Sequence, residues 1–257
     1  LWVAFFIMTA TVSAWALWRS SEDQGRVRLM FFALYLSAIL VLAKSFGALL
    51  FLLMLVPMVM VLSPLMQIRA ALLIGILAIS YPLAKGIDVV PEQGLVSAAE
   101  QVDAERANSL QFRFDNENTL LDRASERPIF GWGSWGRNHI FDEVSGRILT
   151  VTDGRWIIVL GVYGWVGFLA EFGLLILPLV LLWREAGLAR DTETTPYIGA
   201  LSLLLAINIV DMLPNATLTP LTWLIAGALL GYAEQIRHVR LKRPVFEAQP
   251  LRWKPVL

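Results

Sequence analysis

The sequence predicts an all-α fold, a polytopic transmembrane helical bundle of about seven spans with a helical external loop domain. The first observation is composition: apolar residues make up 57% of the 257-residue chain and charged residues only 16%, against about 25% in an ordinary soluble domain. The second is a set of apolar runs close to the roughly 20 residues that a bilayer-crossing helix needs. The third is that these runs are continuously apolar, whereas the strands of a transmembrane β-barrel alternate.

The apolar runs lie on either side of one polar stretch. The predicted spans are residues 1–18, 29–43, 46–63, 69–85, 156–183, 197–213 and 218–234. The second and third are short and are separated only by Lys44 and Ser45, so they form either a tight helical hairpin or a re-entrant pair. We divide the chain into transmembrane helices at 1–84, an external loop at 85–155, transmembrane helices at 156–234 and a basic tail at 235–257. Because it begins at Leu1 without a basic n-region, we expect the C-terminal portion of a longer membrane protein.

The basic residues predict the orientation. Twelve of the 21 Lys and Arg lie in segments 19–28, 64–69, 183–196 and 235–257, and loops rich in these residues face the cytoplasm. We therefore expect a cytoplasmic C-terminus and an external 85–155 segment. In a Gram-negative bacterium this segment would lie on the periplasmic side of the inner membrane.

The composition also excludes some chemistry. The net charge is zero, which gives no support for nucleic-acid binding. The chain has no cysteine, which excludes disulfides, thiolate nucleophiles and cysteine-ligated metals. With only two histidines in addition, we expect neither a metal nor a cofactor.

The external segment is the only sizeable polar stretch. Pro91 precedes a predicted helix over 93–108, and a second predicted helix covers 115–126 and is ended by Pro128. A glycine-rich stretch follows, and three glycines in six residues are typical of a tight, closely approached backbone. Its Trp132 and Trp135 belong either to a membrane-interface belt or to a stacking platform for a sugar.

Seven arginines in this segment are candidate anion ligands. Arg113 and Glu117 are four residues apart, a spacing that allows an ion pair on one helix face. Arg123 and Arg127 form a like-charge pair at the same spacing, which favours an anion bound between them. Arginine suits phosphate because its planar fork donates two parallel hydrogen bonds. The segment therefore predicts a phosphate or acidic-sugar site.

Ionisable residues also lie in or beside the predicted spans. Glu171 falls inside the fifth span, where a charge costs about 3 kcal/mol on insertion scales, so pairing or function is expected. Asp211 lies near the outer end of the sixth span, and Asp153 and Arg155 precede the fifth. Asp153 either caps that helix or takes part in function.

The order of these features matches a family pattern: an Arg, a short helix, a Pro-x-x-Gly-x-Gly turn, a variable external loop, and a span that opens with a catalytic His. Here Arg113 lies 15 residues before Pro128, and the turn reads Pro128-Ile129-Phe130-Gly131-Trp132-Gly133. Over roughly residues 60–235, the chain resembles the O-antigen ligase and O-antigen polymerase superfamily of bacterial polysaccharide assembly.

The resemblance extends into the fifth span, which carries the family's two glycines three apart. They are Gly164 and Gly167, followed by Glu171, and small residues at such a spacing also permit close helix approach. The family His position, 11 residues before Gly164, is Asp153 here, which looks like a sub-branch that uses Asp. His139, 14 residues earlier, is the other candidate base.

The resemblance implies a glycosyltransferase that moves a glycan from undecaprenyl diphosphate to an acceptor hydroxyl, inverting the anomeric carbon and using no metal. The acceptor needs a base, and the departing diphosphate needs positive charge. We expect Asp153 and Arg113 to be catalytic. The residues expected to bind the diphosphate or the glycan are Arg127, Arg137, Arg155, His139, Trp132, Trp135 and Glu117. Those expected to be structural or to shape a lipid groove are Glu171, Asp211, Gly164 and Gly167.

Two other functions stay open. A transporter or flippase for the lipid-linked glycan would concentrate polar residues and broken helices near the bilayer midplane, whereas here they gather in the external segment. The missing His keeps open an inactive structural subunit of the assembly machinery. The expected partners are the undecaprenyl-diphosphate-linked glycan, membrane lipid and other polysaccharide-assembly proteins, with no nucleic acid. No residue distinguishes a polymerase from a ligase, because the two differ in the acceptor.

Overall fold

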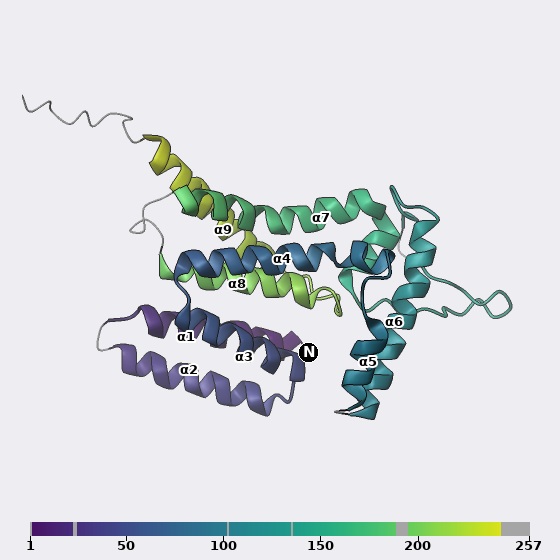
Figure 1. Ribbon diagram of the computed structural model, residues 1–257, viewed down its shortest axis with the longest axis horizontal. Helices are drawn as coiled ribbons and strands as arrows, with labels where there is room; N and C mark the ends of the chain where they lie inside the picture. The colour runs from purple at the N-terminus through teal and green to yellow at the C-terminus, as the bar shows by residue number, and fades with distance from the viewer. Residues whose placement is uncertain (1, 23–24, 102, 135, 189–194, 243–257) are drawn as a thin grey trace, which may run out of the picture.

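The computed structural model describes residues 2–22, 25–101, 103–134, 136–188 and 195–242. This part of the chain is helical, without β-strands, and holds one isolated bridge between Phe141 and Ile148. The helices are α1 (Trp2–Ser20), α2 (Gly25–Leu42), α3 (Phe46–Val61), α4 (Pro64–Gly86), α5 (Glu92–Glu100), α6 (Ala104–Ser125), α7 (Arg155–Leu188), α8 (Pro196–Asp211) and α9 (Pro220–Lys242) (Figure 1). The predicted all-helical class is confirmed.

Each predicted apolar run forms a helix, but the helices differ in length. Four of those described, α1, α2, α4 and α7, are long and apolar enough to cross a membrane. The helices α3 and α8 are apolar but shorter. The chain therefore has the character of a membrane-embedded protein.

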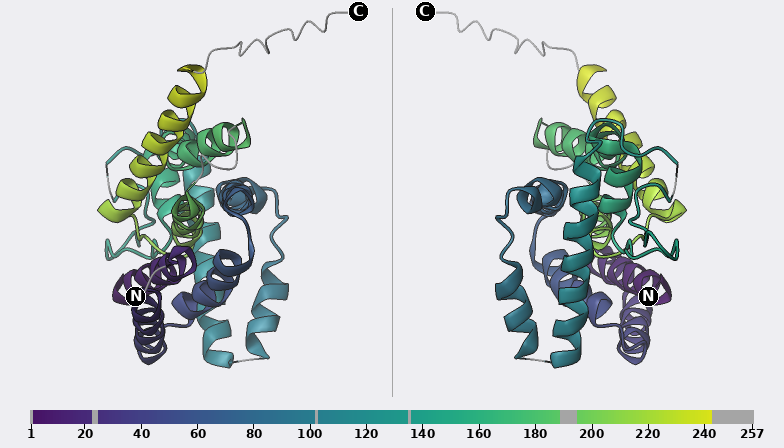
Figure 2. Two further views of the ribbon diagram at one scale, coloured as in Figure 1. Left: turned by 90° about the vertical axis from the view of Figure 1, so that its left-hand side faces the viewer. Right: turned by 90° about the vertical axis from the view of Figure 1, so that its right-hand side faces the viewer.

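The apolar helices and the α5–α6 hairpin have different directions. The apolar helices form an elongated bundle, and α5 and α6 lie across one end of it (Figure 1). Seen from that end, α6 stands in front of the bundle (Figure 2). Contacts of α6 with α7 hold the hairpin against the bundle, so its polar side chains gather at one end of the long helices.

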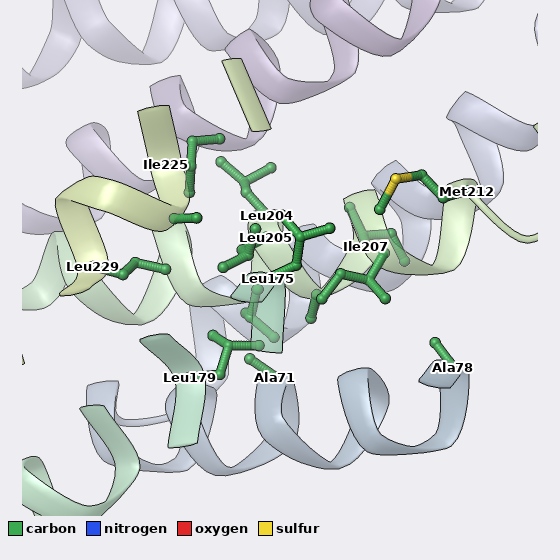
Figure 3. Packing of buried hydrophobic residues seen from close by; sticks show 14 of the residues in the cluster. Ala71, Ala78, Leu175, Leu179, Leu204, Leu205, Ile207, Met212, Ile225 and Leu229 are labelled. Atoms are coloured by element: carbon green, nitrogen blue, oxygen red, sulfur yellow. The ribbon is translucent and has the colours of Figure 1, made fainter. Parts of the chain in front are cut away.

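The centre of the bundle is built by α4, α7, α8 and α9. Leu175 and Leu179 of α7 meet Leu204 and Leu205 of α8, and Ala71 of α4 lies beside them (Figure 3). Small residues such as Ala let helix backbones approach closely where apolar surroundings provide little hydrophobic driving force. This packing fixes the positions of the loops at the end of the bundle.

The helix boundaries predicted for the external segment are partly wrong. A single helix over 93–108 was expected, but α5 ends at Glu100 and α6 begins at Ala104. The Asp103 carboxylate accepts a hydrogen bond from the Glu105 N–H at 2.9 Å, which caps the start of α6. As a result α6 begins well before residue 115 and carries Arg113 in its interior.

Candidate functional site

The helix α7 is broken at Gly164, where φ is 64° and ψ is −165°. The turn 128–133 fills the break with backbone hydrogen bonds. The N–H groups of Trp132 and Gly133 each donate at 2.9 Å to the carbonyls of Gly161 and Val162. On the far side of the break, the N–H groups of Trp165 and Val166 donate to the carbonyls of Pro128 and Ile129 at 2.8 and 3.2 Å. The break therefore leaves these groups paired, as an apolar environment requires.

Glycine is required at both points where the turn 128–133 contacts the break in α7. A Cβ on Gly131 would lie 2.6 Å from the backbone of Val162 and Gly164, and a Cβ on Gly164 would lie 2.4 Å from the Ile129 carbonyl oxygen. Both residues also have positive φ, which favours glycine. A Cβ on Gly167 would meet the Tyr163 side chain at 2.1 Å. The glycine pair predicted from the sequence thus serves the break in α7 and its contact with the turn.

The break lets Arg155, at the start of α7, turn back toward Glu171 in the second half of the helix. Nε and Nη2 of Arg155 donate to the two carboxylate oxygens of Glu171, each at 2.7 Å. The two side chains are 28% and 17% exposed. This bidentate pair accounts for the carboxylate that the sequence places inside an apolar span.

The two residues predicted to be catalytic lie together. Arg113 Nε is 3.6 Å from Asp153 Oδ2, and Arg113 Nη1 donates to the Pro214 carbonyl at 3.3 Å. The two side chains are 35% and 39% exposed. The 3.6 Å contact is longer than a hydrogen bond, so the carboxylate and the guanidinium both keep capacity for a ligand.

The backbone on either side of Asp153 is held by two neighbouring elements. The Val151 N–H donates to Asn116 Oδ1 of α6 at 2.8 Å. The Arg155 N–H donates to the carbonyls of Met212 and Asn215 in the turn after α8, at 2.9 and 3.2 Å. These contacts place the segment that carries Asp153 between α6 and that turn.

The turn after α8 is organised by Asp211. Its buried carboxylate accepts hydrogen bonds from Thr217 Oγ1 at 2.6 Å and from Asn215 Nδ2 at 3.0 Å. A Cβ on Gly154 would lie 2.1 Å from the Leu213 carbonyl oxygen, so this contact also requires glycine. The role of Asp211 is therefore to shape the surface against which Arg113 and Arg155 pack.

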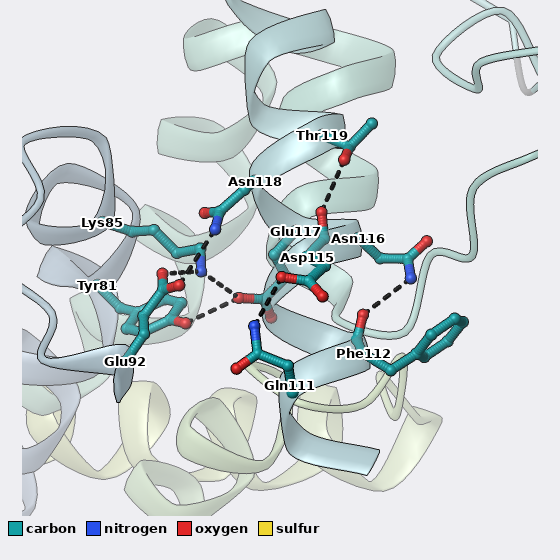
Figure 4. Close-up of polar contacts among 10 residues, drawn as sticks. All are labelled: Tyr81, Lys85, Glu92, Gln111, Phe112, Asp115, Asn116, Glu117, Asn118 and Thr119. Atoms are coloured by element: carbon teal, nitrogen blue, oxygen red, sulfur yellow. Dashed lines mark hydrogen bonds and ion pairs between the residues drawn. The ribbon is translucent and has the colours of Figure 1, made fainter. Parts of the chain in front are cut away.

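A second polar cluster joins the end of α4 to α5 and α6 (Figure 4). The buried ammonium of Lys85 contacts the carboxylates of Glu92 and Glu117, the latter at 3.3 Å, and the Tyr81 hydroxyl donates to Glu117 at 2.8 Å. Burial raises the pKa of the Glu117 carboxyl, while the Tyr81 hydrogen bond and the Lys85 charge act in the opposite direction. The ion pair that the spacing of Arg113 and Glu117 allows does not form, because Glu117 pairs with Lys85 and Arg113 lies against Asp153.

Trp132 lies against two arginines near the end of α6. The guanidinium carbons of Arg123 and Arg127 are 3.4 and 4.5 Å from the centroid of its ring. The Trp132 Nε1–H donates to the Arg123 carbonyl at 2.8 Å, and Arg123 also pairs with Glu126 at 2.8 Å. The indole therefore neighbours both members of the predicted like-charge pair.

The remaining predicted residues have separate positions. His139 is buried, with Nδ1 3.1 Å from the Thr150 hydroxyl, and Arg137 is exposed. Trp135 lies outside the described residues. Among the described residues, no group of three His, Asp or Glu side chains is placed to hold a metal ion.

An apolar groove of about 360 Å³ is lined by residues of α4 and by residues at the end of α8. The residues expected to be structural or to shape a lipid groove, Glu171, Asp211, Gly164 and Gly167, do not line it. Two of its residues connect it to the polar site: Tyr81 bonds to Glu117, and Leu213 precedes Pro214, whose carbonyl holds Arg113. Its lining includes Ile74, Leu77, Ala78, Tyr81, Val210 and Leu213.

Sequence reasoning missed Tyr81, Lys85 and Asn116. Lys85 ends an apolar span and is followed by a polar segment, so its need for a buried acidic partner was the available signal. Asn116 had no such signal, because its amide oxygen accepts a hydrogen bond from the N–H of Val151, a residue 35 positions away in the sequence.

A scan against models of known protein families finds no match to this chain, and a search of curated proteins also finds none.

Proposed function

We propose that the protein is a membrane glycosyltransferase that transfers a glycan from undecaprenyl diphosphate to an acceptor hydroxyl, as its resemblance to the O-antigen ligase and polymerase superfamily implies. The contact between Arg113 and Asp153 carries the proposal. It joins a cation and a carboxylate, both solvent-accessible, at the polar end of an apolar bundle. The proposed topology has seven crossings of the bacterial inner membrane, the 85–155 segment external and the C-terminus cytoplasmic.

The two side chains divide the chemistry. The acceptor hydroxyl oxygen forms a bond to the anomeric carbon while Asp153 accepts the hydroxyl proton. The bond from that carbon to the diphosphate oxygen breaks, its electron pair leaves with the diphosphate, and Arg113 stabilises the developing negative charge. Attack opposite the leaving group inverts the carbon. Asp153 then releases the proton to water, and undecaprenyl diphosphate departs.

The groove between α4 and α8 supports the lipid part of the proposal. A polyprenyl chain is apolar, while its diphosphate and glycan are polar, so the donor needs an apolar surface that ends at a cation. Two residues that line the groove have polar neighbours: Tyr81 donates a hydrogen bond to Glu117, and Leu213 precedes Pro214, whose carbonyl accepts a hydrogen bond from Arg113. Lipid in the groove would present its diphosphate to Arg113.

The other residues expected to bind the diphosphate or the glycan differ in how accessible their side chains are. The Nε and Nη2 donors of Arg155 are engaged by Glu171, so we assign Arg155 to positioning the loop that carries Asp153. His139 is buried with its ring beside Thr150, which favours Asp153 as the base. A transporter is less well supported, because the break in α7 is filled by the turn 128–133.

The test is glycan transfer by purified protein in liposomes that contain a synthetic undecaprenyl-diphosphate oligosaccharide series. Release of undecaprenyl diphosphate is the readout. We expect Asp153→Asn to lower the rate by about 10²- to 10⁴-fold, and Asp142→Asn, in the exposed external loop, to leave it unchanged. Full activity of Asp153→Asn, or loss of activity only in His139→Gln, would overturn the assignment. Movement of the glycan across the bilayer with its glycosyl–diphosphate bond intact would support a transporter instead.

A further inference from the structure

We infer that Arg123, Arg127 and Trp132, with the exposed side chains of Ile129 and Phe130, form a binding site for the headgroup of an anionic phospholipid. We call these five residues the headgroup site. It is separate from the Arg113–Asp153 pair, since Arg123 follows Arg113 by ten positions on α6, which corresponds to about 15 Å. The inference therefore does not depend on glycan transfer.

The charge of the site calls for an anion. Because the guanidinium carbons of Arg123 and Arg127 lie 3.4 and 4.5 Å from one ring centroid, they are at most about 8 Å apart. Both guanidinium groups therefore place positive charge beside the same indole, and each can donate hydrogen bonds of about 2.8 Å to a phosphate. Glu126 pairs only with Arg123 and is exposed, and no described carboxylate pairs with Arg127. One positive charge is left without a counter-ion in the described part of the chain.

The depth of the site matches a membrane surface. After the break at Gly164, the stretch of α7 from Trp165 to Trp183, apolar except for the ion-paired Glu171, has 19 residues, about 28 Å of helix. A hydrocarbon core is about 30 Å thick, and Arg184 follows at the far end. The break, and the turn 128–133 that fills it, therefore lie at one boundary of the core.

The apolar neighbours of the two arginines face outward at that boundary. Ile129 and Phe130 are 60% and 73% exposed. They continue the apolar surface of α7, because the Val166 N–H donates to the Ile129 carbonyl and Val166 is itself half-exposed. Lipid chains would cover these side chains, while the arginines and the Trp132 ring would lie at headgroup level, where such residues are favoured. The combination of two cations and adjoining exposed apolar residues fits a phospholipid better than a soluble phosphate.

The experiment is native mass spectrometry of the full chain in detergent, titrated with phosphatidylglycerol or phosphatidylcholine. We expect preferential retention of phosphatidylglycerol, weakened about fivefold by Arg127→Gln. Arg147→Gln, an exposed arginine in the same external segment, is the matched control and should bind as the wild type does. Arg127→Lys keeps the charge and should retain most of the preference for phosphatidylglycerol.

Three outcomes would overturn the inference. Unchanged lipid binding in Arg127→Gln and in Phe130→Ser would mean that the arginines only pack on Trp132. If these two variants lost binding to undecaprenyl phosphate but kept binding to phosphatidylglycerol, the site would belong to the glycan donor. Complete displacement of phosphatidylglycerol by millimolar inorganic phosphate would show a site for soluble anions. Transfer activity is not a readout here, so failure of the proposed function leaves the test intact.

Discussion

Two arginine–carboxylate pairs lie at the same end of the bundle, and their geometries differ. Arg155 and Glu171 are joined by two hydrogen bonds of 2.7 Å, whereas Arg113 and Asp153 approach only to 3.6 Å and are more exposed. The closer pair links two parts of a broken helix, and the looser pair links α6 to an irregular loop. A saturated pair suits a structural role, and an unsaturated pair suits binding and proton transfer.

The largest expected difference between the pairs is in activity. Arg113→Gln should reduce glycan transfer by about 10²- to 10³-fold, because the leaving diphosphate would lose its cation. Its thermal stability should change little, since an exposed ion pair contributes about 0–1 kcal/mol. Transfer rate and thermal unfolding, measured on the same preparation, test both statements. Arg106→Gln on the same helix is the control, and equal loss of activity in both variants would contradict a specific role for Arg113.

The break in α7, on which the closer pair depends, can be tested by adding one methyl group to the turn that fills it. Gly131→Ala should destabilise the fold by about 3 kcal/mol or more, since the Cβ would overlap the backbone of Val162 and Gly164. Gly133→Ala is the matched control, because Gly133 also has positive φ but has open space around its Cα. It should cost about 1 kcal/mol. Equal unfolding temperatures for the two variants would show that the turn does not fill the break.

The closer pair should affect stability more than the looser one. Glu171→Gln should lower the free energy of unfolding by about 1–3 kcal/mol, because it leaves the half-buried guanidinium of Arg155 without its charged partner. Glu143→Gln, an exposed acid in the loop between α6 and α7, is the control. If Asp153→Asn destabilised the protein more than Glu171→Gln, the structural and functional roles assigned to the two pairs would be reversed.

The smallest expected effect concerns pH and the neighbouring Glu117. Burial raises the pKa of its carboxyl in the folded protein, so the folded state binds more protons than the unfolded state above the ordinary glutamate pKa of about 4.3. Over that interval the free energy of unfolding decreases as pH rises. Glu117→Gln should remove this decrease, whereas Glu105→Gln on the exposed part of α6 should keep it. The effect is measured as the slope of the unfolding temperature against pH between pH 4 and 7. Identical slopes in the wild type, Glu117→Gln and Glu105→Gln would exclude it.

Much of the fold was predictable because apolar runs specify helices directly. Each expected span became a helix, and Pro91 marked the start of α5. The gap between α5 and α6 was not predicted, because it depends on the local cap formed by Asp103. The break at Gly164 was also missed, since the turn that stabilises it lies about 30 residues earlier and a single sequence does not reveal such pairing.

The candidate site was also predictable only in part. Arg113 and Asp153, which the order of motifs singled out as catalytic candidates, lie 3.6 Å apart. The partners of Arg155 and Glu117 were not expected, because long side chains choose among several charges only after packing fixes their distances. Spacing along one helix suggested Arg113 as the partner of Glu117, but Lys85 from α4 is the buried cation that reaches it.

The most direct test of the central claim is a double-mutant cycle on the transfer rate, with Asp153→Asn, Arg113→Gln and the double variant. Residues that act as one unit in the transition state give losses that are not additive. We predict that the double variant is no more than about tenfold slower than the slower single variant. Losses that multiply fully would show that Arg113 and Asp153 act independently, and would contradict a shared catalytic site.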